Sequence, residues 1–260
     1  MNKIYVVPPK KRMLKLFTVL GAIVLFVASL WFLNLDIARF ISRLSNAPRV
    51  IRLLLQLNLA MIIPGLRQFF VSFTMGVTGL IWGGVLAFIL AFLSADNIAP
   101  FKPLAVFIKA YVSIVRAVPS LVIMLMIVAA IGLGYTTGVV GLTISSMGYL
   151  TKAFVASIEE QDRGTITAMR AIGANWGQIV IHGILPVVAT GFLSWVAIRL
   201  ETSVAESITL GVVGAGGIGA LLSRSIRQFD YPSISVLILI IFVCMFVLEI
   251  VANRVRRKFC

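Results

Sequence analysis

Four charged residues stand within or beside otherwise apolar stretches of the sequence: Arg116, Arg199, Glu201 and Glu206. Charges in such positions are costly in a membrane and usually face the interior of a helix bundle or a water-filled cavity. Arg116 is followed closely by Pro119, which kinks a helix and frees backbone carbonyls. We take these five residues as candidates for the lining of a polar path, in which the guanidinium groups would attract an anion.

The spacing of these charges limits how they can pair. Arg199 and Glu201 are two positions apart and therefore point to different faces of a helix. We expect Glu206 to find its partner on a neighbouring span instead. Lys152 and Glu249 are expected to reach the membrane surface with their long side chains, which is the simpler use of a charge in an apolar span.

Four glycines, Gly214, Gly216, Gly217 and Gly219, belong to a G-x-G-x-x-G pattern. That pattern marks a dinucleotide site only after a strand, in a soluble βαβ unit with an acidic residue further on. Here an apolar span follows, so we expect close helix packing or a re-entrant turn. A membrane-embedded dinucleotide enzyme is the alternative, and it predicts bound cofactor after purification.

The sequence predicts neither a catalytic nor a metal centre. His182 is the only histidine, and no cysteine or acidic cluster stands at ligand spacing from it; Cys244 and Cys260 do not suggest a disulfide. No Ser/His/Asp set or carboxylate pair can be assembled, so the chain is not expected to be an enzyme. It also has no G-x-x-x-x-G-K-[ST] loop, and P-loop binding of ATP would therefore require another subunit.

The composition indicates helices that cross a membrane. Of 260 residues 60% are hydrophobic and 12% charged, whereas soluble domains carry about 25% charged residues; the mean hydropathy is +1.06. Crossing a bilayer takes about 20 apolar residues in a helix. The net charge of +14 agrees with Lys and Arg gathered on the cytoplasmic side. Nucleic-acid binding is set aside because the basic residues are scattered between apolar spans.

These features predict an all-α polytopic membrane protein of about six transmembrane helices. The expected spans are residues 16–33, 68–93, a kinked stretch within 101–134 that Pro119 divides, 137–158, 184–200 and 233–252. The glycine-rich residues 206–222 leave the count open by one. An even number of spans places both basic termini on one side, which would be the cytoplasm, with Lys3 in the amino-terminal tail and the first span retained.

We divide the chain into residues 1–67 and 68–258. The first part would hold a cytoplasmic tail, the first span and a basic segment, 34–67, that lies at the membrane surface. Arg39 and Arg43 are one helical turn apart there, as in an interfacial amphipathic helix. If the first span leads outward, this segment conflicts with the usual placement of positive charge. It could bind lipid phosphates or a receptor protein that delivers a substrate.

The polar, glycine-hinged stretch 167–186 interrupts this apolar sequence. Its backbone cannot lie exposed to lipid, because its polar groups would lack partners there. It must lie in water between two spans, where it can touch a soluble partner. The acidic residues Glu159, Glu160 and Asp162 precede it, and the whole cytoplasmic loop is expected at about 159–186.

This stretch resembles the cytoplasmic docking loop of ABC-importer permeases. The family pattern is Glu-Ala-Ala, three residues, Gly, nine residues, Ile, one residue, Leu-Pro. Ala168, Gly173, Leu185 and Pro186 match it. Three positions depart from it: Thr167 replaces Glu, Met169 replaces Ala and Gly183 replaces Ile. Further along, the stretch 116–122 is similar to the Arg-x-x-Pro motif of these permeases, and residues 199–231 resemble the phosphonate-type permeases in particular.

The resemblance covers residues 65 to 258 and implies a type I ABC importer fold like that of methionine permeases. It implies a homodimer in the bacterial inner membrane, two copies of a separate P-loop ATPase that bind ATP and Mg, and an extracytoplasmic solute-binding protein. No cofactor is implied in this chain. Transport would proceed by alternating access, driven through the coupling loop, where the resemblance assigns the contact to Ala168, Gly173, Ala174, Leu185 and Pro186.

Phosphonate, phosphite or phosphate could be attracted by Arg116, Arg199, Arg224 or Arg227. A methionine-type amino-acid permease is the alternative within this class. A channel or carrier that works without ATP is the alternative from another class, and it leaves the docking loop without a role.

Overall fold

The structure is a computed structural model that describes residues 9–33 and 36–259. Within these ranges every regular element is helical, as the composition predicts. Packing divides the chain after Arg52 into two units. The tail up to residue 8, with Lys3, and the terminal Cys260 lie outside the described residues.

The first unit consists of a long apolar helix and shorter basic ones. Helix α1 runs over Pro9–Phe32, α2 over Ile37–Leu44 and α3 over Ala47–Leu54, the last crossing the unit boundary. Asp36 caps α2 by accepting a hydrogen bond from the Arg39 backbone amide at 2.9 Å, and its carboxylate pairs with the Arg39 side chain at 3.0 Å. The basic segment is thus helical around Arg39 and Arg43. Helix α4, which carries Arg67, begins at Ile62.

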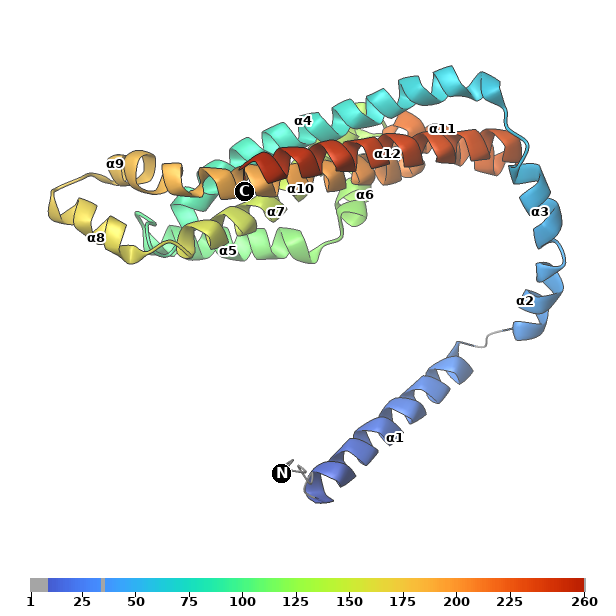
Figure 1. The fold of residues 1–260 in the computed structure, drawn as a ribbon, viewed down its shortest axis with the longest axis horizontal. Helices are drawn as coiled ribbons and strands as arrows, with labels where there is room; N and C mark the ends of the chain where they lie inside the picture. The colour runs from blue at the N-terminus through green and yellow to red at the C-terminus, as the bar shows by residue number, and fades with distance from the viewer. Residues whose placement is uncertain (1–8, 34–35, 260) are drawn as a thin grey trace, which may run out of the picture. The chain divides into compact units, whose positions relative to one another are not determined.

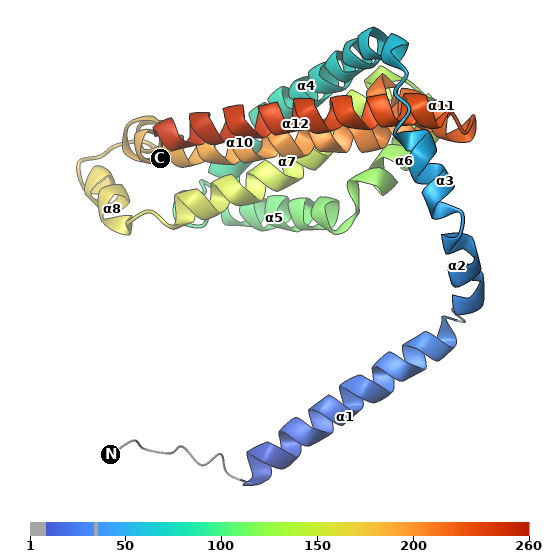
Figure 2. The ribbon, with the colours of Figure 1, turned by 45° about the vertical axis from the view of Figure 1, so that its right-hand side comes forward.

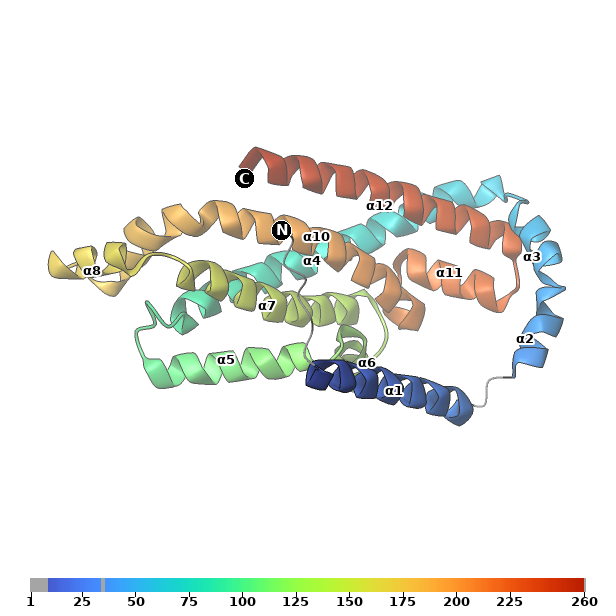
Figure 3. The same ribbon diagram turned by 60° about the horizontal axis from the view of Figure 1, so that its bottom comes forward.

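The second unit is a helical bundle (Figure 1). It comprises η1 Leu59–Met61, α4 Ile62–Ser94, α5 Lys102–Ala117, α6 Ser120–Ile131, α7 Tyr135–Glu159, α8 Arg163–Ala171, α9 Trp176–Gln178, η2 Ile179–Ile184, α10 Leu185–Leu210, η3 Gly211–Ala215, α11 Gly217–Arg227 and α12 Tyr231–Phe259. Figure 3 shows α5, α7, α10 and α12 side by side, with α4 crossing them. Helix α8 extends from one end of this bundle (Figure 2), and α9 lies at the same end (Figure 1).

Small residues let α4 approach its neighbours closely. A Cβ added at Gly79 would lie 2.5 Å from the Leu142 Cβ, and one at Gly83 would lie 2.6 Å from the Ser146 Cβ. Such contacts are too short for any side chain, so both positions require glycine. Because apolar burial gives little drive for association in lipid, close packing of this kind holds membrane helices together.

Five helices of the described ranges are long and apolar enough to cross a membrane, and a bent pair brings the number to six. The pair is α5 and α6, which meet at 92°. Pro119 lies at the break and Val118 before it is extended, with ψ of 124°, as steric clash with the proline ring favours. The division of residues 101–134 at Pro119 is therefore confirmed.

Helix α10 is longer than its expected span of residues 184–200, since it continues to Leu210. The additional turns carry Glu206. Its charge is neutralised by a partner on the same helix, as described below. A helix can therefore continue through a polar stretch when its charges find partners within the bundle.

Candidate functional site

Among the described side chains, Arg199 is the most deeply buried charged one, with 4% of its surface exposed. Its guanidinium donates to the hydroxyls of Ser146 at 3.1 Å and Ser145 at 2.9 Å, both on α7. It also forms a forked pair with Glu206, at 2.9 and 2.8 Å. The ring of Tyr149 lies 5.5 Å from the Arg199 Cζ, within the range of a cation–π contact.

The ion pair joins two residues of one helix. Arg199 and Glu206 are seven positions apart on α10, which places them on the same face two turns apart. The sequence led us to expect a partner for Glu206 on a neighbouring span. The structure gives Glu206 its cation from its own helix, while Ser145 of α7 donates a further hydrogen bond at 3.2 Å.

A cavity of about 240 Å³ opens beside this pair, between α5, α6, α7 and α10. Arg116 and Pro119 contribute to its wall together with Arg199 and Glu206. Arg116 is exposed and makes no ion pair among the described residues. Its side chain passes over Gly148, where an added Cβ would lie 3.2 Å from the Arg116 Cγ. The cavity therefore presents one guanidinium whose charge is not neutralised.

Four of the five candidate path residues thus meet at one cavity, and Glu201 does not. Glu201 is half-buried and faces a separate small hollow, which it shares with Asn253 and Arg256 of α12. This separation follows from the spacing, because Glu201 lies two residues from Arg199 and so points to another face of α10.

The sequence does not single out the α7 residues around Arg199: Ser145 and Tyr149, which line the cavity, and Ser146, which lies beside it. The hydroxyls of Ser145 and Ser146 are the partners that make burial of the Arg199 charge tolerable. Two adjacent serines inside an apolar span, followed by a tyrosine one turn on, are the pattern that would have identified them.

The four glycines of the G-x-G-x-x-G pattern form a tight connection between α10 and α11. Gly214, Gly216 and Gly217 have φ of 111°, 94° and 69°, and a Cβ at Gly219 would collide with the Ile208 carbonyl. The Ile218 amide donates to the Ser72 hydroxyl at 3.1 Å. The preceding residues 210–213 are helical rather than extended, so the strand that a dinucleotide site requires is missing here.

Arg224 and Arg227, the other candidates for attracting an anion, lie apart from the cavity on α11. Arg224 borders a hollow with Gln68 and Tyr135, and Arg227 donates to the Ser223 hydroxyl at 2.8 Å. Of the four arginines considered from the sequence, only Arg116 and Arg199 share a site.

The docking segment consists of α8, a turn at Gly173, α9 and the π-helical η2, which leads into α10. Asp162 caps α8 by accepting from the Gly164 amide at 3.1 Å, and Asn175 and Gln178 form a capping box around α9. Gly173 has φ of 82°, a value that a residue with a side chain rarely adopts. Ala168 and His182 are exposed, Ala174 and Leu185 are half-buried, and Pro186 is an exposed residue in the first turn of α10.

This segment is anchored to the loop between α4 and α5. The Trp176 indole donates to the Ile98 carbonyl at 2.8 Å. The Asn97 side chain of the same loop donates to the Ile158 carbonyl of α7 at 2.7 Å. A displacement of α9 would therefore be transmitted to α4, α5 and α7 together.

Two departures from the docking-loop pattern compensate each other in space. Met169 stands where the pattern has alanine, and Gly183 where it has isoleucine. A Cβ at Gly183 would lie only 2.5 Å from the Met169 Sδ, so the thioether occupies the room that a side chain at position 183 would need. The Met169 side chain on α8 therefore fills the space beside Gly183 on the facing helix η2.

We predict that Gly183→Ile alone lowers the stability of the docking segment by about 1–3 kcal/mol, the usual cost of overpacking. Met169→Ala combined with Gly183→Ile should recover most of this loss. Thermal unfolding of the two variants and of Met169→Ala tests the pairing. Equal unfolding midpoints for Gly183→Ile with and without Met169→Ala would contradict it.

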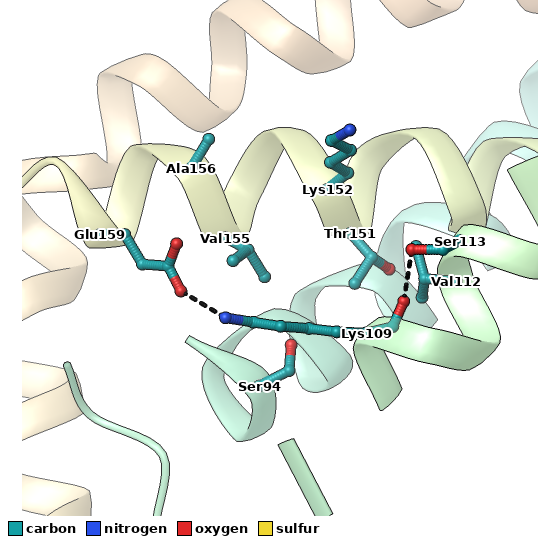
Figure 4. A pocket seen from close by; sticks show the side chains of 9 residues that line it. All are labelled: Ser94, Lys109, Val112, Ser113, Thr151, Lys152, Val155, Ala156 and Glu159. Atoms are coloured by element: carbon teal, nitrogen blue, oxygen red, sulfur yellow. Dashed lines mark hydrogen bonds and ion pairs between the residues drawn. The ribbon is translucent and has the colours of Figure 1, made fainter. Parts of the chain in front are cut away.

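A second charged cluster joins the end of α7 to α5 (Figure 4). The Lys109 ammonium lies 2.8 Å from a Glu159 carboxylate oxygen and 2.7 Å from an Asp96 oxygen. The same Glu159 oxygen accepts from the Asp96 backbone amide at 2.8 Å. These contacts fasten α5 to the end of α7 immediately before the docking segment begins.

Comparison with known proteins identifies the family to which the chain belongs. The model of the family described as "Binding-protein-dependent transport system inner membrane component" matches residues 83–259, which include the cavity and the docking segment. The chain belongs to this family. As an inner membrane component of a binding-protein-dependent transport system, it is a transporter subunit rather than an enzyme itself.

Two curated relatives of this inner membrane component are named as permeases for phosphate and for phosphite. It is 32% identical over 183 residues to the phosphate-import permease protein PhnE of Mycolicibacterium smegmatis, an alignment covering 70% of this chain and 34% of that protein. It is 31% identical over 188 residues to the phosphite transport system permease protein PtxC of Stutzerimonas stutzeri, covering 72% and 68%. The chain therefore spans about a third of the first relative's length.

Among solved structures, the permease of the MetNI methionine ABC transporter in an inward-facing conformation matches with a TM-score of 0.66. The identity is 22%, and the match covers 78% of this chain and 100% of that one. This likeness confirms the methionine-permease-like fold expected from the sequence.

Proposed function

We propose that the chain is the membrane-spanning subunit of an ATP-driven importer for phosphonate or a related oxyanion such as phosphite or phosphate. The observation that carries this proposal is the cavity of Arg116, Ser145, Tyr149 and the Arg199–Glu206 pair. It offers an uncompensated guanidinium and several hydroxyls inside a membrane bundle. Arginine and hydroxyl donors are the groups that bind tetrahedral oxyanions in proteins. The names of the two curated relatives support the same class of substrate.

In this proposal the energy comes from a separate subunit. Two copies of a P-loop ATPase, which bind ATP and Mg, would engage α8, the Gly173 turn and α9 in a homodimer of this chain. Ile172 supports the assignment, since 83% of its surface is exposed beside that turn. A solute-binding protein would deliver the anion from outside the cytoplasmic membrane.

Alternating access would use the anchors already described. Closure of the ATPase pair would displace α9, and the Trp176 contact with Ile98 would carry the displacement to the loop before α5. Helix α5 holds Arg116 at its far end and meets α6 at the Pro119 break. Movement at that break would change how widely the cavity opens.

The topology in this proposal places the docking segment in the cytoplasm. Figure 1 shows α12 running toward the end of the bundle that carries α8 and α9. Arg254, Arg256 and Arg257 near the end of α12 would then lie in the cytoplasm, as expected for basic residues that flank a span. With six spans, the amino terminus would lie there too.

Charge at the cavity disfavours a methionine-type substrate. An amino acid carries an ammonium group, which would need a free carboxylate. Among the described residues that line this cavity, the one carboxylate belongs to Glu206, and both of its oxygens accept from Arg199. An oxyanion, by contrast, has a ready partner in Arg116.

Purification of the tagged chain from its native cells in mild detergent tests the coupling. An equimolar P-loop ATPase is the expected companion, and the oxyanion should stimulate its ATP hydrolysis when the binding protein is present. Recovery of the chain without an ATPase in several detergents would favour a channel or carrier.

We predict that Arg116→Gln lowers oxyanion uptake about 10- to 100-fold, because a hydrogen bond to a charged group contributes about 1.5–3 kcal/mol. Assembly should be unaffected, since Arg116 has no ion-pair partner to leave behind. Uptake of labelled phosphite into cells checks this, with Lys102→Met, an exposed lysine on the same helix, as the matched control. Uptake at the wild-type level in Arg116→Gln would contradict the proposal that this cavity lies on the transport path.

A further inference from the structure

The cavity of Figure 4 lies between α5 and α7, beside the end of α4. Its volume is about 240 Å³. Lys109, Ser113, Lys152 and Glu159 provide its polar wall, with Ser94 and Thr151. The function proposed above uses the ion cluster at one end of this cavity as an anchor, and it gives no role to Lys152.

This cavity, like the first one, has an unpaired cation beside a paired one. Each has two cations and one carboxylate in its wall. In the first, Glu206 neutralises Arg199 at 2.8 Å and leaves Arg116 unpaired. In the second, Lys109 is paired with Glu159 at 2.8 Å and with Asp96, which lies outside the cavity wall, at 2.7 Å. Lys152 is exposed and has no ion pair in the described part of the chain.

The two cavities adjoin along both of the helices that they share. On α5, Ser113 borders the second cavity and Arg116 the first; on α7, Lys152 borders the second and Tyr149 the first. Each pair is three positions apart, and such residues are neighbours on a helix surface. From the first cavity to the second, the order runs toward Glu159 and the docking segment that follows it.

Lys109 retains capacity for a ligand although it is paired. An ammonium group has three N–H donors, and two are engaged by Asp96 at 2.7 Å and Glu159 at 2.8 Å. The third is available to an anion in the cavity. A cavity of this size is at the small end of ligand sites, which fits a small anion rather than a large solute.

We propose that this second cavity is a binding site for a phosphorus oxyanion, with Lys152 as its principal cation and Lys109 as an additional donor. Two sources could supply that chemistry. One is the transported anion on its way from the first cavity, and this source rests on the proposed function. The other is the phosphate of an anionic lipid headgroup, which does not.

Binding of the free anion can be measured by ³¹P NMR of methylphosphonate and inorganic phosphate with the purified chain in dodecyl maltoside, a detergent without phosphorus. Lys152→Met should reduce the relaxation enhancement of the probe by about half, because one of two similarly charged sites is lost. Arg116→Gln should remove the other half of this relaxation enhancement, and Lys102→Met should leave the enhancement unchanged. Lys152→Gln is a second neutral variant should Lys152→Met fold poorly, and Lys152→Arg should keep the binding.

The lipid source is tested by native mass spectrometry with added phosphatidylglycerol. If the headgroup occupies this cavity, the wild-type chain and Lys152→Arg retain the lipid while Lys152→Met loses it, whatever happens to the free anion. If both neutral variants bind free anion and lipid as the wild type does, Lys152 only reaches toward the membrane surface and the second site is refuted.

These outcomes separate the second site from the proposed function. Loss of free-anion binding in Arg116→Gln but not in the Lys152 variants, together with unchanged lipid binding in those variants, would refute the second site and leave the proposed substrate class standing. A wild-type chain that binds no free anion, yet loses lipid in Lys152→Met, would keep the second site and count against the transported oxyanion.

Discussion

Replacing Arg199 by alanine is expected to lower the free energy of unfolding by about 3 kcal/mol, toward the lower end of the range for breaking a buried ion pair. The substitution leaves Glu206 without its cation and removes a donor from both Ser145 and Ser146. The Glu206 side chain is 27% exposed, so water can replace part of what is lost. Thermal unfolding in detergent, followed by tryptophan fluorescence, measures the change.

A double variant separates the structural part of this effect from transport. Arg199→Met together with Glu206→Met removes both charges, and apolar replacement of a whole pair is often close to neutral. We expect this variant to regain most of the stability and to remain defective in uptake, since the polar wall of the cavity is lost. An unfolding midpoint for Arg199→Ala equal to that of the wild type would show that the pair is not held in the bundle as described.

Gly173→Val is expected to reduce ATP-driven uptake more than about tenfold. The backbone at this turn has φ of 82°, and a non-glycine residue held in such a region costs about 1–3 kcal/mol. A β-branched side chain therefore favours a different turn, which reorients α8 against α9. Membrane insertion should be intact, because no atom beyond the adjacent residues lies within 4 Å of a Cβ at this position.

Two other glycine variants provide the controls. Gly173→Asn should be milder, because asparagine enters the left-handed region more readily than other residues with a side chain. Gly177→Ala changes a glycine of α9 without a positive φ and should transport normally. Uptake in Gly173→Val at the wild-type level, with the ATPase bound in equal amount, would count heavily against the docking assignment.

Much of the fold could be predicted from local chemistry. Pro119 cannot continue a helix, and the break occurs there at 92°. The glycine cluster at 214–219 before an apolar span indicated packing, and three of its glycines have positive φ. Hydropathy located the long helices, since a membrane span is recognised by length and composition alone.

The partners of the buried charges could not be predicted, because they depend on contacts between residues far apart in the sequence. The partners of Arg199 lie on its own helix and on α7, more than fifty positions earlier. Periodicity identifies a face of a helix and does not say which other helix meets it. For the same reason the sequence does not identify Ser145 and Tyr149, whereas the Arg-x-x-Pro motif drew attention to Arg116, which borders the same cavity.

The pair Met169 and Gly183 shows why single departures from a pattern mislead. Taken separately, a methionine for alanine and a glycine for isoleucine each weaken the resemblance. In the structure the Met169 side chain fills the space that a side chain at Gly183 would occupy. Volume is conserved in a packed interface even when residue identity is not.

The most direct test of the proposed function is accumulation of phosphite or methylphosphonate in proteoliposomes that hold this chain, its ATPase and the solute-binding protein. We predict accumulation against a gradient that requires ATP, is lost with Gly173→Val and is strongly reduced with Arg116→Gln. Equal movement of the anion with and without ATP, or in the absence of the ATPase, would contradict an ATP-driven importer and indicate a channel or carrier.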